Sequence, residues 1–166
     1  MAAASFDVTS TIDLQEVDNA VNQARKEIGQ RYDFKGSRAA IEFSRGETTL
    51  VLVADDEFKM TALWEVLQAK LVRRGVPTKN LTPGDLERGA NDTVRRQVLL
   101  QQGIPSDTSR AIVKFLKDRK LKKVQTAIQG DQLRISSPSK NDLQAVIGLL
   151  KEQDFGIELQ FGNYRD

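Results

Sequence analysis

Residues 124–135 read VQTAIQGDQLRI, and this stretch decides the fold. Every second residue is apolar or β-branched from Val124 to Ile128 and again from Leu133 to Ile135. Such alternation is typical of a strand that buries one face. Because the turn sequence Gly130-Asp131 separates the two runs, the stretch predicts an antiparallel hairpin with one covered face.

Helical patterns lie on both sides of this hairpin. Pro105-Ser106-Asp107 is typical of a helix start, and apolar residues then recur at helical spacing. A second helix follows the hairpin, and a last strand follows that helix. The apolar residues of these three elements are Ile112, Phe115 and Leu116; Leu143, Val146, Ile147 and Leu150; and Ile157, Leu159 and Phe161. With a strand predicted around Val94, Val98 and Leu100, the second half reads strand, helix, strand, strand, helix, strand.

The first half repeats this plan. A strand with Phe6 and Val8 precedes a helix at residues 13–30, and a hairpin at residues 39–54 precedes a second helix that ends at Gly75. Across both halves, the residues expected in the core include Leu14, Val17, Val21, Leu63, Leu67, Phe115, Leu143, Ile147 and Phe161.

Two units of this kind, each about 80 residues long, predict an α+β fold of two ferredoxin-like (βαββαβ) domains. Each domain is an antiparallel sheet with two helices on one face. We expect the first domain at residues 1–83 and the second at residues 92–166. The first half shows no clear closing strand, so two arrangements stay open. Either residues 84–102 supply that strand, or the domains exchange strands and the N-terminal strand crosses over.

The composition excludes several kinds of chemistry. The chain has 166 residues, with no Cys and no His. It therefore lacks thiolate nucleophiles, disulfides, the usual general base and the usual zinc ligand. We expect no catalytic residue, no metal site and no cofactor. No apolar run approaches the ~20 residues that cross a bilayer, and the N-terminus lacks a secretion signal, so we expect a cytoplasmic protein.

The strongest charge feature is the segment Arg110–Lys123. It holds seven basic residues and one acidic residue, Asp118, in fourteen positions. Clustered cations raise the local concentration of anions, so phosphate groups are the expected ligands. A solvated helix face is the alternative interpretation. The basic residues are Arg110, Lys114, Lys117, Arg119, Lys120, Lys122 and Lys123.

The expected outward positions of the second sheet are polar rather than aromatic. A sheet that reads single-stranded RNA stacks bases on aromatic side chains, and this face offers none. Its polar groups suit hydrogen bonds to a nucleotide, and contact with another domain or subunit is the alternative. These outward residues are Arg95, Gln97, Gln125, Arg134, Glu158 and Gln160.

Residues 32–37 combine aromatic, acidic, basic and flexible side chains. Tyr32 is suited to stacking on a purine, Lys35 to a phosphate, and Gly36 to the close approach of a backbone amide. In the alternative interpretation, Gly36 is a turn residue and Phe34 belongs to the core. Neither a phosphate loop nor a dinucleotide-binding glycine pattern occurs in the chain.

Asp55-Asp56-Glu57 is the densest carboxylate cluster of the chain. Such a cluster is able to hold Mg²⁺. Its position at the start of a predicted helix favours capping of that helix instead, because carboxylates there accept hydrogen bonds from backbone amides.

Five strings, taken in order, resemble the bacterial YajQ family. The resemblance extends from near the first residue to the last, and it implies tandem ribonucleoprotein-like, ferredoxin-like domains that are classed as nucleotide-binding. Some members of that family are described as cyclic-di-GMP effectors. The strings are Ser5-Phe6-Asp7-Val8, Arg31–Ser37, Ile128-Gln129-Gly130-Asp131, Asp142–Val146 and Leu159–Asp166.

The residues and the resemblance together favour a non-catalytic nucleotide-binding protein. The resemblance makes a guanine nucleotide such as GTP, or cyclic-di-GMP, the favoured ligand, with a protein or nucleic-acid partner receiving the signal. Sequence-independent binding of RNA or DNA is one alternative and a protein-interaction adaptor is another, and no membrane partner is expected. The predicted nucleotide-binding residues are Tyr32, Lys35, Gly36, Lys114, Lys117, Arg119, Lys120, Lys122, Lys123, Gln125, Arg134 and Gln160.

Overall fold

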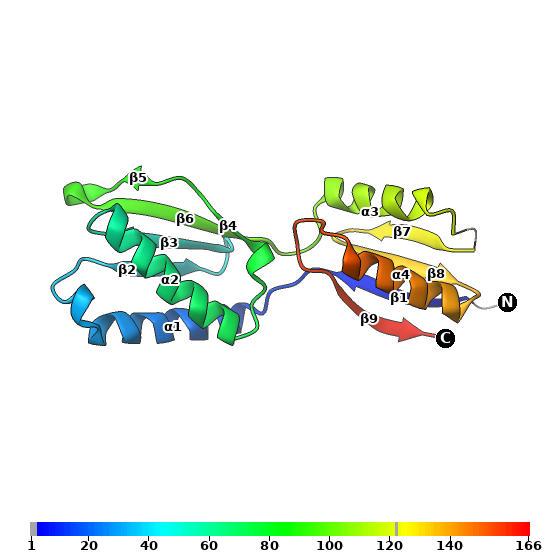
Figure 1. The fold of residues 1–166 in the computed structure, drawn as a ribbon, viewed down its shortest axis with the longest axis horizontal. Coiled ribbons are helices and arrows are strands. Elements are labelled where there is room, and N and C mark those ends of the chain that lie inside the picture. Colours follow the sequence, from blue (N-terminus) through cyan, green and yellow to red (C-terminus); the bar gives the residue numbers. More distant parts are fainter. Residues whose placement is uncertain (1–2, 122) are drawn as a thin grey trace. The chain divides into compact units, whose positions relative to one another are not determined.

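The computed structural model describes residues 3–121 and 123–166 (Figure 1). These residues form two compact units. The central unit is the continuous segment Ile12–Gln101. The C-terminal unit combines the N-terminal segment that ends at Thr11 with Gln102–Asp166.

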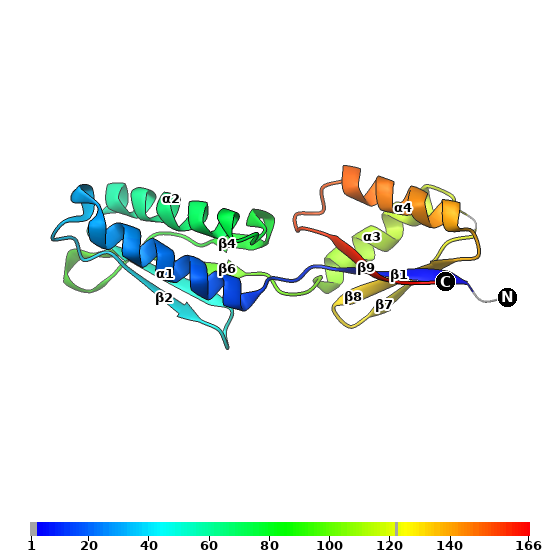
Figure 2. The same ribbon diagram turned by 90° about the horizontal axis from the view of Figure 1, so that it is seen from below.

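The central unit is an antiparallel sheet with two helices on one face (Figure 2). Its strand order is β2-β3-β6-β4, and the short strand β5 also pairs with β6. In chain order its elements are α1 (Leu14–Gln30), β2 (Ala40–Ser44), β3 (Thr49–Ala54), α2 (Glu57–Arg73), β4 (Leu81–Pro83), β5 (Glu87–Arg88) and β6 (Val94–Leu100). Short 3₁₀ helices lie at Tyr32–Phe34, Thr78–Asn80 and Ala90–Asp92.

The C-terminal unit is also an antiparallel sheet with two helices on one face (Figure 2). Its elements are β1 (Ala4–Thr9), α3 (Ser106–Asp118), β7 (Gln125–Gln129), β8 (Gln132–Ser137), α4 (Lys140–Glu152) and β9 (Gln160–Arg165). Their order in the chain is βαββαβ and their order in the sheet is β7-β8-β1-β9. The prediction of ferredoxin-like architecture is confirmed, and β7 and β8 form the hairpin expected at residues 124–135.

The two units exchange their first strands. β1 precedes α1 in the chain but lies in the sheet of the C-terminal unit, where Phe6 is opposite Ile135. β6 precedes α3 but lies in the sheet of the central unit, where Val98 is opposite Leu50. Each of these strands is central in its sheet and pairs on both sides. Both arrangements left open by the sequence are observed: residues 84–102 supply β6 to the central unit, and the N-terminal strand crosses over to the C-terminal unit.

Two assignments made from the sequence are therefore wrong. Phe6 and Val8 were expected in the sheet of the first half, and Val94–Leu100 in the sheet of the second half. A period-two pattern shows that one face of a strand is buried, but both sheets bury one face, so the pattern is the same in either. Arg95 and Gln97 consequently belong to the central sheet, whereas Gln125 belongs to the sheet of the C-terminal unit.

The helix starts follow the capping pattern of the sequence. Asp13 accepts hydrogen bonds from the backbone amides of Gln15 and Glu16 at the start of α1. Asp56 accepts one from the amide of Lys59 at the start of α2. Each carboxylate satisfies amides that have no partner within the helix. None of the described helices is both long and apolar enough to cross a membrane.

Each unit has its own hydrophobic core. Val17, Val21, Leu63 and Leu67 are fully buried between the helices and the sheet of the central unit. Leu143 and Ile147 are buried in the C-terminal unit. Contrary to expectation, the three outermost members of the predicted set are only half-buried: Leu14 begins α1, Phe115 packs edge-on against Phe155, and Phe161 packs edge-on against Phe6.

Candidate functional site

The predicted binding residues do not form a single site. Tyr32, Lys35 and Gly36 lie in the central unit, and the other described ones lie in the C-terminal unit. Lys122 lies outside the described residues. Three of the predicted residues, Lys117, Lys120 and Gln125, line one pocket of the C-terminal unit.

This pocket lies between the C-terminal half of α3 and the first residues of β7. Its volume is about 530 Å³, within the usual range of about 300–1,000 Å³ for small-molecule sites. The remaining lining residues are Val113, Leu116, Leu121, Val124 and Thr126. The pocket therefore joins an apolar wall to two ammonium groups and one side-chain amide.

The end of α3 positions the two lysines. The amides of Arg119 and Lys120 donate to the carbonyls of Leu116 and Lys117, which closes the last helical turn. Lys120 then takes the left-handed conformation, with φ 57°, that commonly ends a helix. Lysine ammonium groups at the C-terminal end of a helix are stabilised by the negative end of the helix dipole. The same positive charges attract an anion to this end of the helix.

The described cations of the Arg110–Lys123 segment, which exclude Lys122, are not neutralised by carboxylates. Among the residues that the structure describes, none of the side chains of Arg110, Lys114, Lys117, Arg119, Lys120 and Lys123 forms an ion pair. Arg119 is the one that has a clear partner, because its guanidinium lies 4.2 Å from the centre of the Phe115 ring. Arg119 is not among the residues that line the pocket.

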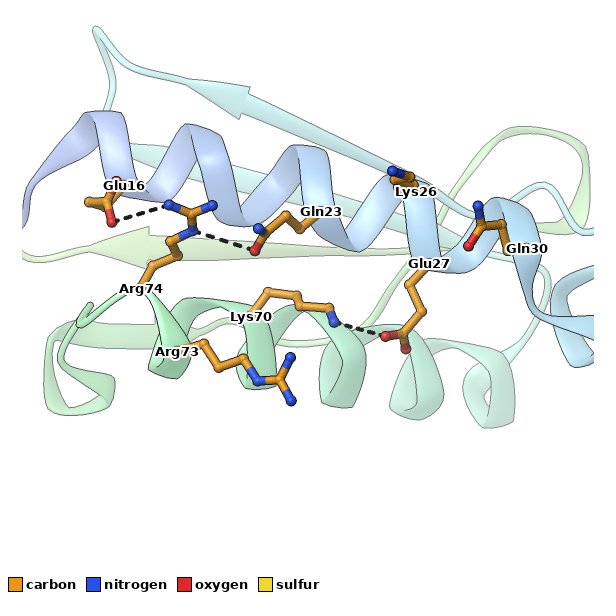
Figure 3. A pocket seen from close by; sticks show the side chains of 8 residues that line it. All are labelled: Glu16, Gln23, Lys26, Glu27, Gln30, Lys70, Arg73 and Arg74. Carbon is orange, nitrogen blue, oxygen red and sulfur yellow. Dashed lines mark hydrogen bonds and ion pairs between the residues drawn. The ribbon is translucent and has the colours of Figure 1, made fainter.

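A second pocket lies on the central unit between α1 and α2, and both of its carboxylates are ion-paired, while two of its four cations, Lys26 and Arg73, form no ion pair among the described residues (Figure 3). Lys70 Nζ is 2.9 Å from Glu27, and Arg74 is 3.7 Å from Glu16, so both cations point at carboxylates across the groove (Figure 3). Lys70 and Arg31 hold the pKa of Glu27 below its usual value, which keeps this carboxylate charged. A volume of about 560 Å³ is again suitable for a small ligand, but no apolar residue is among those that line this pocket.

Arg134 lies on the open face of the C-terminal sheet, where it neutralises a buried carboxylate. Its Nε is 3.2 Å from Asp7, whose other partners are Arg165 at 2.8 Å and Asn163 at 2.7 Å. The hydrogen bonds from Arg165, Asn163 and Arg134 lower the pKa of Asp7 to about 2. Arg134 is therefore held at the sheet through its Nε, while its side chain remains 40% exposed.

Gln160 is also engaged within the unit. Its side-chain oxygen accepts hydrogen bonds from the amide and the hydroxyl of Thr11, at 3.1 and 2.8 Å, and its amide nitrogen donates to the Thr11 carbonyl at 2.9 Å. Gln160 thus fixes the segment that leaves β1. Of the predicted polar sheet residues in this unit, Gln125 is the one that lines the pocket.

Residues 32–37 show features of both interpretations made from the sequence, a ligand-binding segment and a turn with an aromatic residue in the core. Tyr32 is 88% exposed, which leaves its ring free for stacking, and Lys35 is exposed beside it. Phe34 is buried in the core and Gly36 is a left-handed turn residue with φ 73°. The cations Arg31 and Lys59 both lie over the Phe34 ring, so this aromatic serves packing.

The carboxylates at residues 55–57 serve the local structure. Asp56 caps α2, and Asp55 accepts hydrogen bonds from Ser37 and Arg38, which lower the pKa of Asp55. Within the described residues, no group of three or more Asp or Glu side chains is arranged to hold a metal ion.

The apolar wall of the α3–β7 pocket was not recognised in the sequence. Val113, Leu121 and Val124 have the spacing of core residues, and each is half-buried because the pocket exposes part of it. Their direct proximity to Lys117, Lys120 and Gln125 in the chain was the available signal. The pairing of Asp7 with Arg134, Asn163 and Arg165 was also missed, although Asp7 alternates with Phe6 and Val8 and so had to face outward.

Comparison with known proteins gives one consistent result. A family model described as nucleotide-binding protein YajQ-like matches residues 4–165. A nucleotide-binding protein of Heliobacterium modesticaldum is 50% identical over 162 residues, which cover 98% of this chain and 97% of the relative. One of Koribacter versatilis is 48% identical over 165 residues, 99% of either chain, and one of Desulfitobacterium hafniense is 49% identical over 161 residues, 97% of either chain.

Proposed function

The chain belongs to the YajQ-like family, and we propose that it is a non-catalytic nucleotide-binding protein whose ligand occupies the pocket between α3 and β7. The observation that carries this proposal is the combination of two unpaired lysines with an apolar wall in one pocket. The names of the relatives support the class of ligand, and the pocket supports the place.

The pocket offers a separate contact for each part of a nucleotide. The base packs against the apolar wall formed by Val113, Leu121 and Val124. Lys117 and Lys120 bind the phosphates as charged hydrogen-bond donors. The Gln125 amide, which carries both donors and an acceptor, bonds the base edge and provides a means to distinguish bases.

Guanine nucleotides, including cyclic-di-GMP, are the first ligands to test, because the family resemblance points to them. In this role the protein is an effector that passes ligand occupancy to a protein or nucleic-acid partner. The absence of His and Cys from the sequence supports binding without hydrolysis, as does the use of Asp55 and Asp56 in local hydrogen bonds.

Isothermal titration with a panel of guanine and adenine nucleotides tests the proposal. The double variant Lys117→Gln, Lys120→Gln should lose at least about tenfold in affinity, since each charge-assisted hydrogen bond is worth ~1.5–3 kcal/mol. The matched control is Arg110→Gln, Lys114→Gln, which removes the same charge from α3 outside the pocket. Equal losses in both variants would show that the pocket is not the site.

Sequence-independent RNA or DNA binding is the second candidate function. The observation that favours it is the row of unpaired cations on α3, from Arg110 to Lys117, which continues to Lys123. A polyanionic strand would use this whole row, whereas a nucleotide uses only the part beside the pocket.

A further inference from the structure

Within the part of the chain that the structure describes, the outer edge of β7 has no strand beside it. β7 is the first strand of the order β7-β8-β1-β9, so among the described residues it pairs with β8 alone. Its sequence, Gln125-Thr126-Ala127-Ile128-Gln129, contains no charge and no proline. Ile128 is 50% exposed. An uncharged, regular edge of this kind is a template for a further strand.

The other sheet edges each carry a feature that hinders strand addition, and the edge strand β5 consists of only two charged residues. On β2, Arg25 donates to the Ile41 carbonyl at 3.1 Å, and Glu42 adds a charge. β9 carries a register shift near its left-handed residue Asn163 and ends at Arg165. β4 has only three residues and ends at Pro83. Charges, bulges and prolines are the usual devices that prevent strand addition, and within the described residues β7 shows none of them.

We propose that β7 pairs antiparallel with β7 of a second copy of this chain, with the two-fold axis at Ala127. In this register Gln125 lies opposite Gln129 of the second copy, and Thr126 lies opposite Ile128. Antiparallel pairing at the axis brings the two Ala127 Cα atoms to about 4.5–5.5 Å, which suits a small side chain. The two pairs of Thr126 with Ile128 across the axis cover the exposed Ile128 side chains.

The charges that flank β7 also match in this register. Lys123 precedes the strand and Asp131 follows it, and both side chains are exposed. The two-fold axis places Lys123 of one copy opposite Asp131 of the other, twice in each dimer. This complementarity is specific to a second copy in antiparallel orientation. A parallel arrangement would instead place like charges together.

One feature opposes the dimer and makes it dependent on salt. In each copy the helices cover one face of the sheet (Figure 2). A two-fold axis perpendicular to the joined sheet therefore places both α3 helices on the same face, where their cations approach each other. Salt screens this repulsion, and a bound polyphosphate neutralises it. We therefore expect the dimer to strengthen when salt rises from 0.05 M to 0.3 M, which is opposite to the behaviour of an interface held mainly by ion pairs.

Cysteine cross-linking tests the interface directly, because the natural chain contains no Cys. Ala127→Cys should form a disulfide-linked dimer after oxidation with diamide, since Cα atoms about 4.5–5.5 Å apart satisfy disulfide geometry. Gln125→Cys or Gln129→Cys alone should cross-link poorly, but a mixture of the two should cross-link well. Ala40→Cys, on the exposed edge of β2, is the control for random collision.

Sedimentation of the natural chain gives the matching measurement. Ala127→Lys places two like charges at the axis and should raise the dimer dissociation constant at least tenfold, whereas Ala40→Lys should leave it unchanged. The proposal is overturned if the natural chain remains monomeric at 0.1 mM and 0.3 M salt. It is also overturned if Ala127→Cys links no faster than Ala40→Cys. Loss of nucleotide binding in the pocket variants has no bearing on either result.

Discussion

Phe6 lies directly opposite Ile135 in the sheet of the C-terminal unit, and both side chains are fully buried. The residues between them include the whole of the central unit. The core of the C-terminal unit is therefore completed by the first strand of the chain, and the core of the central unit by β6.

This exchange predicts which unit each core substitution affects. Phe6→Leu should destabilise the C-terminal unit by about 1–2 kcal/mol, because it removes buried ring atoms. Hydrogen exchange followed by mass spectrometry should show faster exchange in β8 and β9, with α1 and α2 unchanged. The matched variant Val98→Ala should do the reverse and speed exchange in β3. Faster exchange of α1 in Phe6→Leu would contradict the strand exchange.

Hydrophobic periodicity was sufficient to predict most helices and strands, but it was insufficient to predict the exchange of strands between the two units. The hairpins at residues 39–54 and 124–135 and the helix stripes each depend on neighbouring residues, so the sequence pattern reports them. The partner of β1 depends on which sheet offers a vacant central position, and Phe6 and Val8 have the same alternation in either case. Only the pairing of Phe6 with Ile135 distinguishes the two.

The sequence indicated the charged residues of the candidate site but not the apolar residues that line it. The cluster around Lys117 and Lys120 is evident in the sequence. Val113 and Leu121 look like core residues, because helical spacing does not show that a helix leaves part of its apolar side uncovered. Arg134 was predicted as a ligand contact, but its pairing with Asp7 depends on a strand from the other end of the chain.

The carboxylate of Asp7 should contribute stability that depends on pH. The pKa of Asp7 is about 2 in the folded protein and ~3.9 in an unfolded chain. A lowered pKa gives stability that is complete above pH ~4 and lost as the pH falls toward 2. Asp7→Asn should therefore lower the free energy of unfolding by about 1 kcal/mol at pH 7 and by almost nothing at pH 2. The value at pH 7 is smaller than the full pKa shift implies, because the arginine partners of Asp7 are partly exposed to solvent.

Urea unfolding of Asp7→Asn and the natural chain across pH 2–7 checks this expectation. The exposed residue Asp85 provides the control, since the free energies of unfolding of Asp85→Asn and the natural chain should differ little at every pH. A stability loss in Asp7→Asn that does not change between pH 7 and pH 2 would mean that the charge of Asp7 is not its source.

Asp56 should act as a helix cap and not as a catalytic group. Asp56→Ala removes the acceptor for the Lys59 amide and should lower the free energy of unfolding by ~1 kcal/mol. Asp56→Ser should recover most of that loss, because Ser also caps helices. Neither variant should change nucleotide affinity in the presence of Mg²⁺. The natural chain should not hydrolyse nucleotides, and Mg²⁺-dependent hydrolysis that Asp56→Ala abolishes would reverse this assignment.

The salt dependence of binding separates a nucleotide site from a polyanion surface. If a single-stranded RNA binds the row on α3 through Z phosphates, log affinity should fall with log salt at a slope of about −0.7Z. Lys114→Gln should make that slope shallower by roughly one contact, while the affinity for a nucleotide in the pocket remains the same. An equal effect of Lys114→Gln on both ligands would place them on one surface.

Mapping the ligand by NMR tests the central claim most directly. Backbone amide shifts are recorded while the best guanine nucleotide of the titration panel is added to the isotope-labelled chain. We expect the largest changes at Val113, Lys117, Lys120 and Gln125, with saturation at the calorimetric dissociation constant. Residues 32–37 and the groove between α1 and α2 should not shift. Changes centred on Tyr32 and Lys35, with the amides of α3 and β7 unmoved, would contradict the account.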